Sequence, residues 1–471
     1  MRRVVRVLAT FVGIVTASCG GTAPTGDASA DTVIPTDPTP ALDPSTSTTT
    51  VQQVETTTTS TAPVETTPAS TTTVLEIDNP SGRDDDHCRL LDARAERYSP
   101  SVGFPRIEDL RTEGRLNIEL AVIDFDDLPA ESDLLDDAVA QAGRLSDWLT
   151  EMSQGRLQAD WEIVPEVVRL PFASTDLPVS KRGPEYVTQA LAASDVLVEA
   201  LDPFIDFSES DLLVVVPPRA IEAIDTDITF INISPESDEG VVPRLFASGA
   251  FFYEPGPYDG DPTDVDDDRL WSFWAHELMH AFGLAGHAPD SLEFGSAPDP
   301  RTDVHLGSTQ DALSKALSTW DLFLLGWLAD EEVICLDASD LPLEVQLEAV
   351  EARSGSRPIS AMVRLSDNEL LVVESKRAVG FGVDLAPSTG GVMAYRVDTT
   401  IENNRAADTW DGQLGERFAW FLEPENADAG DRFESGVNPF IREGGSALSD
   451  GVRVAVVDSS GRDIVSLTSS S

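Results

Sequence analysis

The chain has 471 residues, in which 83 aspartates and glutamates outnumber 32 lysines and arginines, so the formal net charge is −51. This charge argues against nucleic acid or an anionic membrane surface as a binding partner, because both would repel it. The length allows more than one domain with a sizeable core, and three cysteines are too few for a disulfide scaffold.

Residues 1–19 have the order of a secretory signal. Arginines precede a short apolar run over residues 7–15, and small residues lead up to Cys19. The end of the segment resembles a bacterial lipobox, although Thr16 stands where that motif usually has leucine. The resemblance implies a lipoprotein signal peptide and a lipidated Cys19 that holds the protein on the outer face of the membrane. The alternative is a plain secretory signal with an incidental cysteine.

Residues 20–83 consist almost entirely of Thr, Ser, Pro, Ala, Asp and Gly. Such a segment has too little apolar surface to offset the entropy lost on ordering. We therefore expect a disordered, extended stalk between the envelope and the folded part.

The folded part starts near residue 84 with an alternation of strand and helix patterns. The expected elements, in chain order, are a strand in 115–127, a helix in 132–153 with Ser132 as N-cap, strands in 155–171, a helix in 186–204 and a strand in 210–218. This order predicts a twisted sheet covered by helices.

The pattern changes after Cys335. Short alternating runs are broken there by Asp-Asn and Ser-Gly turns, which is typical of strands without helices. We therefore expect an α+β protein, with a first domain over residues 84–335 and an all-β domain over 336–471.

The stretch "HELMHAFGLAGH" runs from His276 to His287 and contains the pattern H-E-x-x-H. Its surroundings predict a helix over 271–286, on which His276 and His280 share one face and can bind one Zn²⁺. Glu277 lies beside that face and could act as general base towards a water molecule. The alternative is a buried helix whose histidines are satisfied by hydrogen bonds.

A catalytic zinc needs a third protein ligand. Gly283 can end the helix in a left-handed conformation and turn the chain back. Metzincins place the next ligand three residues after this glycine, but Gly286 has no side chain. We rank His287 first as the third ligand, with a surface histidine as its alternative. The other candidates, in order, are Asp290 and then Asp303 or His305.

Six stretches between about residues 110 and 400 resemble, in unbroken order, the immune inhibitor A family of secreted bacterial zinc peptidases. These stretches are ELAVIDFDD, WLTEMSQGRLQADWEIVPEVVRLP, ALDPFIDFSESDLLVVV, HELMHAFGL, STWDLFLLGWL and ELLVVESKRAVGFGVDLAPSTGGVMAYRVDT. The resemblance implies a metzincin-like zinc-peptidase domain followed by a β region.

Three positions depart from the family pattern. Met279 replaces the usual glycine before the second histidine, and Ala285, Gly286 and His287 occupy a place where an acidic residue is usual. Leu306 lies near the position of a methionine that forms the floor under the metal. Leucine can also provide an apolar floor, so the change is compatible with activity.

Weaker candidate sites precede and follow the helix. The acidic stretch 258–268 could bind Ca²⁺, which prefers several oxygen ligands, but it lacks EF-hand spacing and is equally explained as a solvated loop. Tyr253, Tyr258 and Tyr395 are candidate oxyanion donors, although a core or surface position is the simpler interpretation of each.

The cysteines have separate explanations. If Cys19 carries lipid, Cys88 and Cys335 remain as a pair in an oxidising environment. They stand at the two ends of the first folded domain, and domain ends often lie close together. We therefore expect a disulfide between them; the alternative is two separate thiols.

Together these features predict a membrane-tethered zinc endopeptidase on the extracellular face of a bacterial membrane. It would act on protein or peptide substrates, as a lipid-anchored monomer. The first alternative is a metallopeptidase-like binding module on the cell surface that has lost efficient catalysis. The second is a structural spacer, against which the intact Glu277 argues.

Overall fold

The computed structural model describes residues 85–94, 101–108, 110–177, 186–224, 227–230, 235–249, 269–284, 316–382, 390–401, 419–422, 424–425 and 440–470. The predicted signal peptide with Cys19 and the predicted stalk over 20–83 lie outside these residues. Among the helices in the described ranges, none has the length and apolar character needed to cross a membrane.

The first sheet is built around a central strand, β1. Across the sheet, the strands are β2 (Leu157–Ile163), β1 (Gly114–Asp124), β4 (Leu212–Val216), β6 (Leu245–Ser248) and β5 (Asp227–Phe230), and β3 (Val168–Arg169) pairs with the end of β1. The first four are parallel to one another, and β5 is antiparallel to β6. The predicted strands therefore form one mixed sheet.

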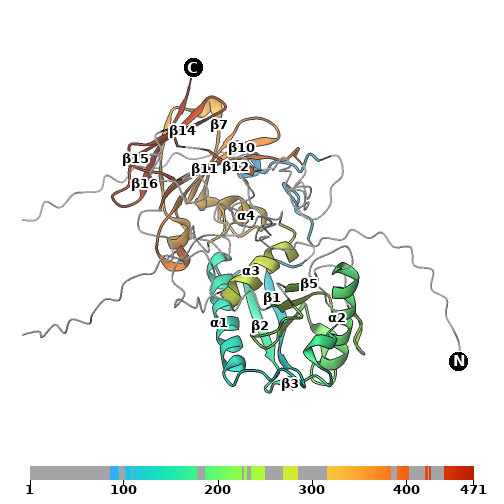
Figure 1. Ribbon diagram of the computed structural model, residues 1–471. Coiled ribbons are helices and arrows are strands. Elements are labelled where there is room, and N and C mark those ends of the chain that lie inside the picture. Colours follow the sequence, from blue (N-terminus) through green and yellow to red (C-terminus); the bar gives the residue numbers. More distant parts are fainter. Residues whose placement is uncertain are drawn as a thin grey trace, which may run out of the picture. The chain divides into compact units, whose positions relative to one another are not determined.

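Both faces of this sheet are buried. Ile118 faces α1 (Leu134–Met152), whereas Ile123 packs in a second core beneath α2 (Tyr186–Leu201). Figure 1 shows the two helices on opposite sides of the sheet. This two-sided burial explains why the strands are continuous apolar runs in the sequence.

The start of α1 differs from the prediction. The N-cap is Asp133 and not Ser132, and its side chain makes no capping hydrogen bond. One oxygen of the Asp133 carboxylate accepts a hydrogen bond of 3.1 Å from Arg219 Nη1.

The β region contains two further sheets. One has the order β12 (Ala419–Phe421), β11 (Gly391–Asp398), β10 (Glu369–Lys376), β9 (Ser360–Arg364) and β7 (Val333–Asp337), with β13 (Phe440–Ile441) paired to β11. The other has the order β14 (Ser446–Ser449), β15 (Val452–Asp458), β16 (Asp463–Ser469) and β8 (Leu343–Leu347). Side chains of both sheets share one apolar core, as in a β-sandwich.

The predicted domain boundary after Cys335 falls inside β7. This strand pairs in parallel with β9, so the sheet of the β region already begins at Val333. The fold as a whole is a mixed α/β arrangement with several sheets and few helices.

A buried arginine ties the β region to the helical part. Arg353 donates to both carboxylate oxygens of Glu332, at 2.8 and 2.6 Å. It also donates to the carbonyls of Met152, at the end of α1, and Trp327, at 3.1 and 2.8 Å. The guanidinium thus donates to two backbone carbonyls as well as to a carboxylate.

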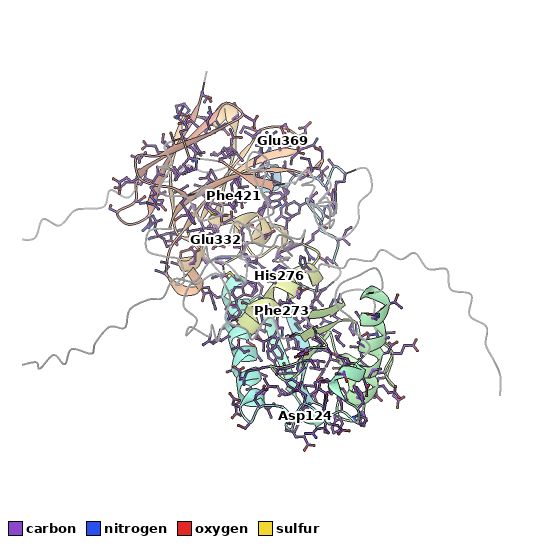
Figure 2. The ribbon with its side chains drawn as sticks, viewed as in Figure 1. Asp124, Phe273, His276, Glu332, Glu369 and Phe421 are labelled. Atoms are coloured by element: carbon purple, nitrogen blue, oxygen red, sulfur yellow. A yellow bond between two sulfur atoms is a disulfide. The ribbon has the colours of Figure 1, made fainter. Side chains whose placement is uncertain are left out.

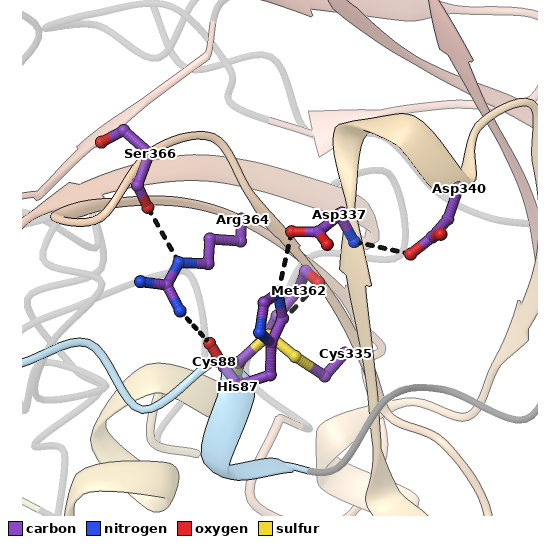
Figure 3. Close-up of a disulfide and its surroundings, with 8 residues drawn as sticks. All are labelled: His87, Cys88, Cys335, Asp337, Asp340, Met362, Arg364 and Ser366. Atoms are coloured by element: carbon purple, nitrogen blue, oxygen red, sulfur yellow. Dashed lines mark hydrogen bonds and ion pairs between the residues drawn. A yellow bond between two sulfur atoms is a disulfide. The ribbon is translucent and has the colours of Figure 1, made fainter.

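A disulfide joins the two cysteines that the sequence analysis pairs (Figure 3). Cys88 follows a short 3₁₀ turn, Cys335 lies in β7, and their Cα atoms are 5.9 Å apart. Beside the bond, His87 Nε2 lies 2.8 Å from Asp337 Oδ1, and Arg364 donates to the His87 carbonyl at 2.9 Å. The beginning of the folded part is thus attached to the first strand of the β region.

Candidate metal centre

The helix that carries the H-E-x-x-H pattern is α3 (Arg269–Ala281), and it lies wholly inside the protein. Residues 270–284 are all buried, including Phe273 and His276, which Figure 2 labels on this helix. The helix is thus buried on all sides, although it carries two histidines and a glutamate. The sequence pattern predicts the helix itself, but not that both its faces are covered.

Contacts from two neighbouring elements hold α3 in place. The amide of Trp271 donates to Gln141 Oε1 of α1 at 3.1 Å, which satisfies one of the unpaired donors in the first turn. The indole of Trp274 donates to Ser248 Oγ of β6 at 3.2 Å. These bonds position α3 along the first sheet.

The end of α3 agrees with the role predicted for Gly283. This residue has φ of 80°, and its amide donates to the His280 carbonyl at 2.9 Å. The amide of Leu284 donates to the Met279 carbonyl at 3.2 Å, which completes a Schellman motif. The helix therefore ends at Ala281, five residues before the predicted end.

A segment from the start of the folded part holds this turn. The Ser101 amide donates to the Gly283 carbonyl at 2.8 Å, and Arg106 Nη1 donates to the Phe282 carbonyl. These bonds satisfy carbonyls that the helix leaves without intrahelical partners. The sequence contains no local signal for this contact, because the partners are more than 170 residues apart.

The two histidine rings converge through the nitrogens that a metal would use. His276 Nε2 and His280 Nε2 are 3.2 Å apart, and the ring planes are at 86°. Each histidine is 5% exposed, and Glu277 between them is fully buried. The helical spacing of four residues thus produces the shared face that the sequence predicts.

The separation of the two nitrogens fits zinc. Two nitrogens at 2.0–2.1 Å from one tetrahedral zinc would be about 3.3–3.4 Å apart. The same separation also suits a hydrogen bond from one Nε2–H to the other Nε2, which requires one ring to carry its proton on that nitrogen. Zinc instead requires the lone pairs of both Nε2 atoms and a proton on each Nδ1.

The described residues contain two of the predicted zinc ligands and the predicted base. His287 and its alternatives Asp290, Asp303 and His305 lie outside them, as do Leu306, Tyr253, Tyr258 and the acidic stretch 258–268. Within the described ranges, no three His, Cys, Asp or Glu side chains form a group that could hold a metal. A third ligand would therefore have to come from the remaining residues.

Sequence reasoning missed a buried polar cluster at the start of α4 (Thr319–Leu324). Glu374 Oε2 accepts from the amide and the hydroxyl of Thr319, both at 2.7 Å, and from the Tyr395 hydroxyl at 3.1 Å. Burial raises the pKa of Tyr395 well above its usual range, and the nearby Glu374 adds to this effect. Tyr395 thus has a core position, which was the simpler of its two interpretations.

A lysine completes this cluster. Lys376 Nζ lies 3.5 Å from Glu374 Oε1 and donates to the carbonyls of Ala316 and Leu317 at 2.9 and 3.0 Å. These carbonyls directly follow the segment 285–315, which contains the candidate third ligands. The only sequence signal was the run Glu-Ser-Lys at the end of an apolar strand, where polar residues ordinarily indicate exposure.

Comparisons with known proteins identify no family. No family model matches the chain, and no curated protein matches it. Among solved structures, the chain is similar to catalytically inactive OgpA from Akkermansia muciniphila, in complex with the O-glycopeptide substrate glycodrosocin. That match covers 64% of this chain and 88% of the other, with 12% sequence identity and a TM-score of 0.24. A TM-score this low does not establish a common fold.

Proposed function

We propose that the chain is a zinc-dependent endopeptidase with a metzincin-like catalytic domain, related to the immune inhibitor A family. The observation that carries the proposal is the 3.2 Å separation of His276 Nε2 and His280 Nε2 on a buried helix, with Glu277 between them. A zinc-peptidase site uses both features together, whereas a structural histidine pair does not need a neighbouring glutamate.

His276 and His280 would hold the zinc, with His287 as the third ligand. The metal would supply a Lewis acid that polarises the substrate carbonyl and makes a water molecule easier to deprotonate. Glu277 accepts the proton of the attacking water and then delivers it to the leaving amine, so one carboxylate serves as base and acid in turn.

The anchoring of α3 supports this function. Gln141 and Ser248 hold the side of the helix, and Ser101 and Arg106 hold its end. A catalytic group works best on an element whose position is fixed by surrounding contacts. These bonds keep the backbone that carries the two histidines from shifting as substrate binds.

The proposed setting follows from the N-terminal residues. A lipid on Cys19 would anchor the protein to the outer face of the bacterial membrane, and residues 20–83 would act as an extended stalk. The substrate would be protein or peptide, the protein would act as a monomer, and the acidic stretch 258–268 is a candidate Ca²⁺ site.

The test combines metal analysis with hydrolysis of casein for the wild type and Glu277→Gln. We expect both proteins to hold about one zinc per chain, because the glutamate is not a ligand. Hydrolysis should fall by roughly 100- to 10,000-fold in the variant, which lacks the general base. Glu199→Gln, at an exposed position of α2, is the matched control and should leave both values unchanged.

The same assays separate the alternatives. Zinc binding without hydrolysis in the wild type would support the binding module, and full activity of Glu277→Gln would contradict the mechanism.

For the third ligand, His287→Ala should lose zinc at low free metal, whereas Asp290→Ala and His305→Ala should retain it. Retention by His287→Ala would transfer the role to another residue.

A further inference from the structure

An open cavity of about 760 Å³ lies in the β region, and no residue of α3 lines it. Part of its wall comes from the 3₁₀ turn η9 (Val350–Ala352), through Ala352, and from the two residues 348–349 before this turn. The rest comes from residues after β10, at the start of β11, after β13 and between β15 and β16. The volume lies in the range of roughly 300–1,000 Å³ that is typical of ligand-binding pockets.

Basic side chains outnumber acidic ones on the cavity wall, although Asp463 already pairs with one of them, Arg377. Three arginines, Arg377, Arg442 and Arg462, line it together with two glutamates, Glu348 and Glu443. In the whole chain, 83 acidic residues outnumber 32 basic ones. Basic side chains are therefore in the majority on this wall, whereas acidic side chains are in the majority in the chain as a whole.

One of the two glutamates is already neutralised by neighbours. Glu348 Oε1 lies 3.3 Å from Arg357 Nη1 and 3.9 Å from Arg462 Nε, and Ser354 Oγ donates to Oε2 at 2.8 Å. Because Arg357 and Ser354, which do not line the cavity, already contact its carboxylate, Glu348 would oppose an incoming anion only weakly. Glu443 is exposed, where water screens its charge.

Arg377 is held in position by groups that do not line the cavity. Its Nη2 pairs with the fully buried Asp463, and its Nη1 donates to the Lys376 carbonyl at 3.2 Å. Asp463 is itself fixed, because it accepts from Ser375 Oγ at 2.6 Å and from Ser459 Oγ at 2.7 Å. A guanidinium has five N–H donors, so a fixed Arg377 keeps further donors for a ligand.

Arg462 is arranged in a similar way. Its Nη1 donates to Gln346 Oε1 at 3.2 Å. The side chains of Arg377 and Arg462 are 26% and 31% exposed, so each is anchored on one side and open on another. Two preorganised guanidinium groups on one wall suit an oxyanion, because little rotamer entropy is lost on binding.

The rest of the wall is apolar. Ala349, Ala352, Ala378 and Val379 line it, and Val379 is 44% exposed. Phosphate or sulfate alone would make no use of these surfaces. A ligand that combines a carboxylate with an aliphatic skeleton would satisfy both the arginines and the apolar wall.

We propose that this cavity binds an acidic peptide segment, with side-chain carboxylates on Arg377, Arg442 and Arg462 and aliphatic side chains against the alanines and Val379. The planar guanidinium matches a carboxylate through two parallel hydrogen bonds. The proposal goes beyond the zinc site and does not depend on it.

Two variants change the cavity in different ways. Gly461→Phe adds a large side chain at a lining residue in the β15–β16 turn, where an added Cβ meets no atom within 4 Å. Arg462→Gln removes a charge from the wall without leaving Asp463 unpaired. Arg115→Gln is the matched control, because Arg115 is 72% exposed and pairs with Asp160 on the first sheet.

The experiment is a fluorescence-anisotropy titration of the full chain with a labelled peptide of three aspartates and two leucines. Its counterpart has asparagine in place of each aspartate. We expect the wild type to bind the acidic peptide at least about ten-fold more tightly than its counterpart. Gly461→Phe and Arg462→Gln should each weaken binding by roughly ten-fold or more, and Arg115→Gln by less than about two-fold.

Three results would overturn the proposal: no binding to the wild type up to about 1 mM peptide, equal binding of the two peptides, or unchanged binding by Gly461→Phe. Circular dichroism verifies that each variant is folded, and if one variant does not fold, the other decides. Glu277→Gln should bind the acidic peptide like the wild type, so the result is separate from the fate of the zinc proposal.

Discussion

Glu119 is a buried carboxylate in the middle of β1, on the face that packs beneath α2. It is 4% exposed, and among the described residues its Oε2 has no hydrogen-bond partner. Burial raises its pKa from 4.5 to about 7, and the nearby Glu162 and Asp206 add to the rise. Glu162 is its neighbour in the parallel ladder between β1 and β2, so the repulsion is built into the strand register.

This carboxylate should make stability depend on pH. The folded state holds the Glu119 proton up to a pH of about 7, whereas an unfolded chain loses it near 4.5. The contribution of Glu119 to stability is therefore fully present below pH 4.5 and is lost as the pH rises towards 7. We expect Glu119→Gln to exceed the wild type in free energy of unfolding by roughly 1–3 kcal/mol at pH 8.

Urea titrations at pH 5 and pH 8 measure this difference. The advantage of Glu119→Gln should shrink at pH 5, and Glu199→Gln, at an exposed position of α2, should show no such trend. An equal effect of Glu119→Gln at both pH values would show that ionisation of Glu119 is not the cause.

At the scale of elements, the beginning of α4 depends on the β region. Thr319 donates to Glu374 through its amide and its hydroxyl, and the Trp320 amide donates to the Tyr395 hydroxyl at 3.1 Å. Glu374 lies opposite Met393 and Tyr395 opposite Val372, so Glu374 and Tyr395 are diagonal to each other on the adjacent strands β10 and β11. The strands thus supply partners for amides that the first turn of a helix leaves unpaired.

Removing the Thr319 hydroxyl should weaken this connection. Thr319→Val keeps the shape of the side chain but deprives the buried Glu374 of one donor, which should lower the free energy of unfolding by roughly 1–3 kcal/mol. The matched control is Thr400→Val, because the Thr400 hydroxyl also donates to a carboxylate, Asp398 at 2.6 Å, but at an exposed position. Denaturation followed by tryptophan fluorescence measures the free energy of unfolding of both variants. An equal decrease in Thr319→Val and Thr400→Val would show that burial of the Thr319 contact does not matter.

At the scale of the whole molecule, the Cys88–Cys335 disulfide connects residues 247 positions apart in sequence. It fixes the beginning of the folded part to β7, where the α/β part meets the β region. Arg353 adds a second connection through Glu332, Met152 and Trp327. The two parts are therefore joined by a covalent bond and by a buried ion pair.

Loss of the disulfide should destabilise the folded state. In the double variant Cys88→Ala/Cys335→Ala, we expect the free energy of unfolding to fall by roughly 2–5 kcal/mol, because the unfolded chain gains conformational entropy. Cys19→Ser, outside the linked pair, should leave it unchanged. Mass spectrometry of a non-reduced digest provides the direct measurement: two freely alkylated cysteines in the native protein would contradict the bond.

The sequence by itself determined the features that depend on neighbours along the chain. Strands β1, β2 and β4 and helices α1 and α2 follow from apolar periodicity, whereas β5 and β6 were not predicted. The end of α3 follows from Gly283, and the shared face of His276 and His280 from their spacing. The pairing of Cys88 with Cys335 was expected because, with Cys19 assigned to a lipid, only two cysteines were left. Residue type and spacing carry enough information for such features, because the physical cause acts within a few residues.

Only the tertiary structure decided what depends on distant residues. It placed Gln141 at the start of α3 and Ser101 at its end, and it buried Lys376 with Glu374. It also paired β7 with β9, in the sheet of the β region. It also brought Arg377 and Arg462 to one cavity from strands and turns far apart in sequence. None of these contacts produces a local periodic pattern. A charged residue in a sequence is ordinarily interpreted as exposed, and only the folded structure shows that a distant partner lies beside it.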